Sequence, residues 1–125
     1  MEIISIEATD ETPAVTLDAS SNTFDFSGKS LPEDVSTFYN PILDWFDSYS
    51  LNPNETTVVD FKLTYFNTAS SKCILDILMK LEEISEEGNS AVTINWHYQE
   101  DDEDMEEAGE EYADIVDIPF EMMPY

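Results

Sequence analysis

The stretch from Val58 to Leu78 limits the possible folds of this chain most, because a strand pattern changes there into a helix pattern. Apolar and polar residues alternate from Val59 to Tyr65, as expected for a strand with one buried and one solvent-facing side. From Ile74 to Ile84 the apolar residues recur every three or four positions, which is typical of a helix with one apolar stripe. The segment between them must hold the end of a strand and the start of a helix.

This junction, residues 67–71, reads Asn-Thr-Ala-Ser-Ser. Asn and Thr side chains accept hydrogen bonds from the free N–H groups at a helix start. The same N–H groups and the helix dipole favour negative charge. A phosphate on one of the hydroxyls would bring about −1.5 to −2 charges to this N-terminus. The junction is therefore suited to act as a switch.

The rest of the chain can be divided into further strands and helices around this junction. Strands are predicted at residues 4–8, 15–17, 24–26, 92–98 and 117–122, and helices at 35–49 and, more weakly, 105–116. Gly28-Lys29-Ser30 is expected to break the third strand, and Pro41 to kink the first helix or begin a second one. The helix after the junction should stop near Gly88.

The alternation within these strands predicts the architecture. Each strand has one apolar and one polar face, whereas a parallel sheet covered on both sides would show nearly continuous apolar runs. Two strands joined by one helix form a parallel βαβ unit. We therefore expect residues 1–125 to form a single α/β domain with a mixed sheet, helices mainly on one face, and a polar sheet face left open.

The net charge narrows the choice of partners. The chain has 29 acidic residues against four lysines and no arginine, which gives a formal net charge of −25. Binding to nucleic acid or to an anionic membrane needs a basic patch, so neither is expected, and a basic partner surface is favoured. The charge by itself also leaves open an acidic nucleic-acid mimic that would occupy a basic groove.

Cysteine usage and hydropathy favour the cytoplasm. Cys73 is the only cysteine, so no intramolecular disulfide or cysteine-based zinc site can form. The N-terminal residues carry no basic region, and no apolar run approaches the roughly 18 residues of a membrane span, so neither a signal peptide nor membrane insertion is expected.

Several motifs together resemble one known family. They are Phe24-x-Phe-Ser-Gly-Lys-Ser-Leu-Pro-Glu-Asp34, Phe38-Tyr-x-Pro-x-x-x-Trp45, Phe61-x-Leu-x-Tyr-Phe-Asn-Thr-Ala-Ser-Ser-Lys72 and Asp101-Asp-Glu-Asp-Met-x-Glu-Ala-Gly-Glu110. Their order and spacing, from about residue 12 to residue 120, resemble the SiaC family of bacterial regulatory phosphoproteins. The family more often has arginine where this chain has Lys29.

The resemblance implies a fold similar to STAS domains and a role in signalling without catalysis or cofactors. In that family a threonine is phosphorylated by a dedicated kinase, SiaB-like, and dephosphorylated by a PPM-type phosphatase, SiaA-like. By position this residue is Thr68, surrounded by Asn67, Ala69, Ser70, Ser71 and Lys72. The unmodified form is thought to engage an effector such as a diguanylate cyclase, which makes cyclic di-GMP. We expect the modification to block a partner surface without refolding the domain.

Each of these residues also has a simpler interpretation. Thr68 could serve only as a helix cap, and Ser70 and Ser71 are competing acceptors. Lys72 is the best placed cation to meet a phosphate, since alternation points Lys62 to the polar sheet face. The acidic residues Asp101, Asp102, Glu103 and Asp104 form either a solvated loop or a docking site for a basic partner. They lack the spacing of a twelve-residue calcium loop, and no metal site is predicted.

The remaining reactive groups, a surface histidine and a packed cysteine, are not expected to take part in catalysis. His97 lies on the polar face of its strand with no paired catalytic motif, so a hydrolase or lyase built on it is the least favoured function. Cys73 lies beside the apolar stripe of its helix, where packing is its simplest role. The aromatic residues of the first helix are expected to pack it or, for some of them, to stay exposed as contact residues: Phe38, Tyr39, Trp45 and Phe46.

Overall fold

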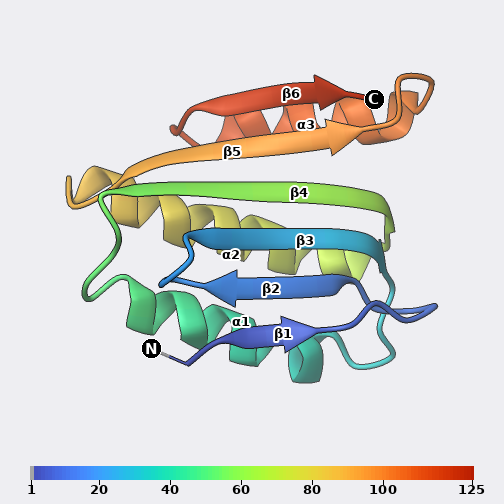
Figure 1. The fold of residues 1–125 in the computed structure, drawn as a ribbon. Coiled ribbons are helices and arrows are strands. Elements are labelled where there is room, and N and C mark those ends of the chain that lie inside the picture. Colours follow the sequence, from blue (N-terminus) through green and yellow to red (C-terminus); the bar gives the residue numbers. More distant parts are fainter. Residues whose placement is uncertain (1) are drawn as a thin grey trace.

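The computed structural model describes residues 2–125 as one mixed sheet with helices on one side (Figure 1). The strands are β1 (Ile4–Ile6), β2 (Ala14–Asp18), β3 (Thr23–Ser30), β4 (Thr56–Phe66), β5 (Ala91–Tyr98) and β6 (Phe120–Pro124). The helices are α1 (Val35–Tyr49), α2 (Thr68–Glu86) and α3 (Glu103–Ile115). The predicted α/β class, mixed sheet and one-sided helices are thus confirmed. Likeness to STAS domains stays a prediction.

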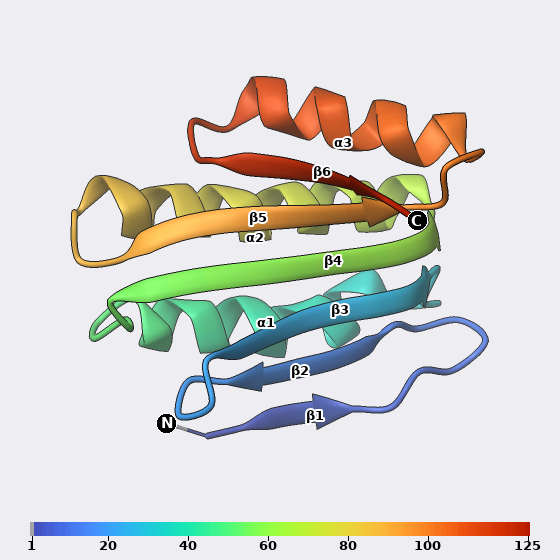
Figure 2. The ribbon, with the colours of Figure 1, turned by 45° about the horizontal axis from the view of Figure 1, so that its top comes forward.

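The strands lie in the sheet in the order in which they follow one another in the chain, β1-β2-β3-β4-β5-β6. The first three are antiparallel, while β3 to β6 run parallel, with one helix between each neighbouring pair (Figure 2). The predicted hairpin of β2 and β3 and the βαβ unit of β4, α2 and β5 are both confirmed. This topology brings the starts of all three helices to one edge of the sheet, beyond the carboxyl ends of the parallel strands.

The core lies between the sheet and the helices and is rich in aromatic rings. Phe26 stacks on Phe61 with ring centroids 4.8 Å apart, and Trp45 stacks on Tyr49 at 5.2 Å. On the other sheet face Asp60, Lys62 and the other alternate residues of β4 stay at least partly accessible. The alternation in sequence therefore identified the buried face correctly as far as Leu63, whereas Tyr65, expected on the same face, is 51% exposed.

The prediction that Gly28-Lys29-Ser30 ends the third strand is wrong. The strand continues to Ser30 because it pairs in parallel with β4 along this stretch, with a register shift between Gly28 and Lys29. Gly28 has a φ of 109°, a conformation that side-chain-bearing residues rarely adopt. The register shift at Gly28 is thus accommodated by a β-bulge, and the strand continues beyond it to Ser30.

The first helix is continuous, so the alternative of a second helix starting at Pro41 is not realised. The helix begins after Asp34, whose side chain accepts hydrogen bonds from the backbone N–H and the hydroxyl of Thr37. Trp45 is buried, as expected for packing of this helix.

The last strand begins at Phe120, later than predicted, and Ile118 is buried in the loop before it.

Helix α3 packs on the sheet against Trp96 of β5. The indole N–H of Trp96 donates a 3.0 Å hydrogen bond to the carbonyl of Met105, and its ring meets the ring of Tyr112 at 5.5 Å. This contact explains why a strongly acidic segment forms a packed helix.

Within residues 2–125 no helix combines the length and apolar character that crossing a membrane requires.

Candidate functional site

The strand–helix junction is fixed by Asn67. Its side-chain oxygen accepts a 2.8 Å hydrogen bond from the N–H of Ser70, and its own N–H donates to the carbonyl of Ser30 at 3.0 Å. Asn67 is therefore the N-cap of α2, and Thr68 is the first helical residue, followed by the exposed Ala69. The helix begins six residues before the apolar stripe, so its first turns are polar by sequence.

The three hydroxyls of the junction differ in accessibility. Thr68 is exposed, and no hydrogen bond within residues 2–125 occupies its hydroxyl. Ser70 has none of its surface exposed. Ser71 is half-buried, and its hydroxyl lies 2.9 Å from the hydroxyl of Tyr112 on α3. Of the three, only Thr68 offers an unhindered oxygen to an enzyme.

A buried hydroxyl network lies beneath Thr68. The Ser70 hydroxyl donates to the carbonyl of Ser30 at 3.0 Å and lies 2.9 Å from the Ser30 hydroxyl, which in turn is 2.5 Å from the hydroxyl of Tyr39. Burial raises the pKa of Tyr39 to about 12, so the phenol stays protonated. The network ties the start of α2 to β3 and α1 and makes this junction rigid.

The lysines lie at different distances along the chain from Thr68. Lys72 lies one helical turn beyond Thr68, so the two side chains share a face of α2. It is exposed and forms no ion pair within 4 Å in the described part of the chain. Lys29 is paired across the sheet with Tyr65. Lys62 is on the open sheet face, as predicted, with its ammonium 4.6 Å from the ring centroid of Tyr125.

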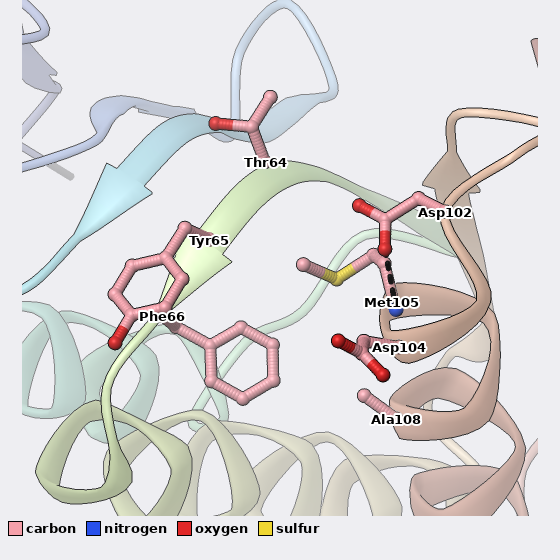
Figure 3. A pocket seen from close by; sticks show the side chains of 7 residues that line it. All are labelled: Thr64, Tyr65, Phe66, Asp102, Asp104, Met105 and Ala108. Carbon is pink, nitrogen blue, oxygen red and sulfur yellow. Dashed lines mark hydrogen bonds between the residues drawn. The ribbon is translucent and has the colours of Figure 1, made fainter.

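A groove of about 390 Å³ lies next to the junction, between the end of β4 and the start of α3 (Figure 3). Its lining consists of Thr64, Tyr65 and Phe66 from the strand, Asp102 from the N-cap of α3, and Asp104, Met105 and Ala108 from the helix itself. Asp104, Met105 and Ala108 lie across the gap from the Phe66 ring (Figure 3). The fold thus brings part of the acidic run close to the residues that lead into Thr68.

The four acidic residues of that run have different roles. Asp102 is the N-cap of α3 and accepts a 3.1 Å hydrogen bond from the N–H of Met105. Asp104 stands on the groove rim, while Asp101 and Glu103 are exposed and do not line the groove. A solvated loop is therefore not the full description, because the run begins a helix.

The other reactive groups lie apart from the junction's exposed hydroxyl. The Nε2 atom of His97 is 2.8 Å from Asp60 on the open sheet face, where the same carboxylate accepts a hydrogen bond from Asn95. Cys73 is half-buried against the core, and burial raises the pKa of its thiol. No group of three metal-binding side chains occurs within residues 2–125.

The groove and the hydroxyl network could not be predicted from the sequence. Thr64, Tyr65 and Phe66 are consecutive in the strand, and nothing in the pattern tells which helix lies beside them. The helical spacing of Met105 and Ala108 was visible, but not the surface that they face.

A one-sided α/β domain that presents an exposed threonine at a helix start, beside a groove with an acidic rim, has the features of a regulatory binding domain. The family model described as SiaC family regulatory phosphoprotein matches residues 6–125. The chain therefore belongs to the SiaC family, and the resemblance found from its motifs is confirmed.

Solved structures agree with this assignment. The structure of SiaC of Pseudomonas aeruginosa has a TM-score of 0.91 with 29% identity, covering all of both chains. A crystal structure of the diguanylate cyclase SiaD in complex with its activator SiaC, from the same organism, gives 0.91 with 30% identity over 98% of this chain and 99% of that one. An uncharacterized protein of Pseudomonas aeruginosa strain UCBPP-PA14 is 31% identical over 96% of this chain and 94% of its own length. In the complex of SiaC with SiaD, SiaC is the activator and SiaD the enzyme, so the family's role is regulatory.

Proposed function

We propose that this chain is a phosphorylation-controlled activator of a diguanylate cyclase. Thr68 receives a phosphate from a SiaB-like protein kinase and loses it to a SiaA-like PPM-type phosphatase. The unmodified form binds the cyclase and raises the synthesis of cyclic di-GMP. Membership of a regulatory phosphoprotein family and the complex of SiaC with SiaD support this proposal. A cytoplasmic location fits a kinase that uses ATP.

The observation that carries the proposal is the contrast among the three hydroxyls. Thr68 is exposed, while Ser70 is sealed and Ser71 is bonded to Tyr112. A kinase must bring the acceptor oxygen into its own active site, so an oxygen held in the core cannot serve. Thr68 meets this requirement without unfolding of the helix.

The surroundings of Thr68 can accept the charge of a phosphate. The dipole of α2 favours an anion at this end by about 0.3–1 kcal/mol, and Lys72 is free to turn toward it. The overall charge of −25 opposes the phosphate at long range, where salt screens it. Phosphorylation is therefore expected to leave the fold intact and to act by blocking the partner surface, which includes Thr68.

Mass spectrometry after incubation with a SiaB-like kinase and ATP tests whether Thr68 is the acceptor. We expect one phosphate on the peptide between Lys62 and Lys72, lost in Thr68→Ala and retained in the matched control Ser71→Ala. Circular dichroism before and after the reaction checks that the fold is unchanged. Retention of the phosphate in Thr68→Ala would falsify the assignment.

Binding to the cyclase tests the switch. The unmodified protein and Thr68→Ala are expected to bind, while the phosphorylated protein and Thr68→Asp bind weakly or not at all. Strong binding by fully phosphorylated protein would contradict the blocking mechanism. We also propose that the acidic residues at positions 101–104 contact a basic surface of the partner.

The alternative functions receive less support. An acidic nucleic-acid mimic rests on the net charge of −25 alone. A hydrolase or lyase built on His97 conflicts with the regulatory role of the family, and His97 lies beside Asp60 on the sheet face that the helices leave open.

A further inference from the structure

The groove between β4 and α3 combines an apolar floor with a negative rim. Phe66, Met105 and Ala108 supply apolar surface, while Asp102, the N-cap of α3, and Asp104, in its first turn, supply two carboxylates. The volume of about 390 Å³ is large enough for a long side chain and too small for a folded segment. A suitable occupant must therefore have an apolar stem and a positive end.

One of the two carboxylates is held in place by the backbone. Asp102 uses one oxygen to cap α3, through the 3.1 Å hydrogen bond from the N–H of Met105. Its second oxygen has no hydrogen bond within residues 2–125 and points toward β4 in Figure 3. The cap thus orients a carboxylate oxygen toward the groove before any ligand arrives.

Phe66 favours a guanidinium over an ammonium group. Its ring borders the groove opposite Asp104 and Ala108 (Figure 3). A guanidinium is planar, is weakly hydrated and stacks on aromatic rings while donating to carboxylates, whereas an ammonium is a compact, strongly hydrated charge. An aromatic wall beside two carboxylates therefore selects arginine.

We infer that this groove receives an arginine side chain of the effector, with its stem on Met105 and Ala108 and its guanidinium between Asp102, Asp104 and the Phe66 ring. The inference rests on the proposed function in one respect, that an effector binds at this end of the domain. The charge of the chain supports it, because an arginine meets a molecule with a formal net charge of −25. The groove adds specificity to that general attraction.

A short peptide can test the groove without any effector or kinase. The probe is acetyl-Gly-Arg-Gly-amide, and its matched control has citrulline in place of arginine, which keeps the shape and removes the charge. Amide chemical shifts are followed by NMR during titration to about 20 mM, which nearly saturates a site with a Kd of about 1 mM. We expect saturable shifts at residues 64–66 and 102–108 with the arginine peptide only.

Variants separate the groove from the rest of the acidic surface. Asp104→Asn should weaken binding of the arginine peptide about two- to fivefold. Asp102→Asn should weaken it to the same extent while the helix keeps its cap, because Asn caps helices as well as Asp. Ala108→Leu should weaken it by filling the groove without a change of charge. Glu110→Gln, at an exposed position of the same helix and outside the groove, should leave the affinity unchanged.

Four results would overturn the inference. They are equal shifts with the citrulline peptide, equal affinity for a peptide with lysine in place of arginine, an equal loss in Glu110→Gln, and no saturable shift in the groove. None of them touches the phosphorylation of Thr68, which is measured separately by mass spectrometry. Loss of phosphate transfer to Thr68 with intact peptide binding would instead count against the proposed function alone.

Discussion

Gly109 of α3 lies directly against the indole of Trp96 on β5. A Cβ atom on Gly109 would lie 2.4 Å from Cδ1 of Trp96 and 2.6 Å from its Nε1. The closeness of the helix to the sheet therefore depends on a missing side chain. The same approach lets the indole N–H reach the carbonyl of Met105.

Gly109→Ala is predicted to destabilise the protein. Overpacking against a rigid ring costs about 1–3 kcal/mol, and the better helix propensity of alanine offsets about 1 kcal/mol of that. Urea unfolding followed by tryptophan fluorescence measures the net loss. Glu110→Ala, at the next and exposed position, is the control that should change little. An unfolding midpoint above that of the unmodified sequence would show that α3 can move away from Trp96 without cost.

Asn67→Ala is predicted to lower the free energy of unfolding by about 0.5–2 kcal/mol, because the first turn of α2 loses its cap. Asn67→Asp should retain the stability, since Asp accepts the same hydrogen bond from the N–H of Ser70 and its charge suits the helix dipole. Chemical denaturation of the three proteins compares them. Equal loss in both variants would mean that the cap is not what stabilises the junction.

Ser70→Ala is predicted to cost about 1–3 kcal/mol, because the buried hydroxyl and carbonyl of Ser30 each lose a partner. Thermal and urea unfolding measure the loss. Ser36→Ala, an exposed serine of α1, provides the comparison. Since Thr68 keeps its position at the helix start, phosphate transfer to it should persist in Ser70→Ala at a temperature where the variant stays folded. A fully stable Ser70→Ala protein would remove the buried network as a source of rigidity.

Asp25→Asn is predicted to raise the melting temperature at pH 7. Burial, followed by the nearby charge of Asp60, raises the pKa of Asp25, and His97 partly opposes this shift. A raised folded-state pKa means that ionisation of Asp25 weakens the fold, so the stability present below the ordinary value of 3.8 is lost as pH rises. The difference between variant and parent should therefore shrink toward pH 3. The partial exposure of Asp25 keeps the effect small.

Asp18→Asn provides a control of opposite sign. Hydrogen bonds from the hydroxyl and the backbone N–H of Ser20 lower the pKa of Asp18, so its charged form stabilises the fold at neutral pH and that contribution is lost as pH falls. We expect this variant to melt lower than the parent at pH 7. Shifts of the same sign in both variants would show that general charge repulsion, and not the local environment, decides the pH dependence.

Local sequence patterns predicted most of the sheet. The alternation in β4 identified its buried face, and Gly88, with a φ of 77°, ends α2 where the pattern expects it. The start of α2 was harder to locate, because its first turn carries hydroxyls in place of an apolar stripe. Ser70 shows why, since it is buried through hydrogen bonds to Ser30, and hydropathy does not record such partners.

Long-range relationships could not be predicted. The continuation of β3 beyond Gly28 depends on pairing with β4, which lies more than thirty residues further along the chain. The groove likewise depends on where α3 packs, and this is set by Gly109 and Trp96 together. The position of Thr68 at a helix start could be predicted from its neighbours in sequence, whereas the groove beside it could be found only in the three-dimensional structure.

The sequential strand order has a consequence for biosynthesis. Each strand can pair with the one that left the ribosome just before it, so folding need not wait for the whole chain. Ser30 and Tyr39, which support the start of α2, are made before Thr68, whereas α3 is made after it. During translation the threonine thus gains the residues that support it first, and the neighbouring groove is completed only after α3 has been made.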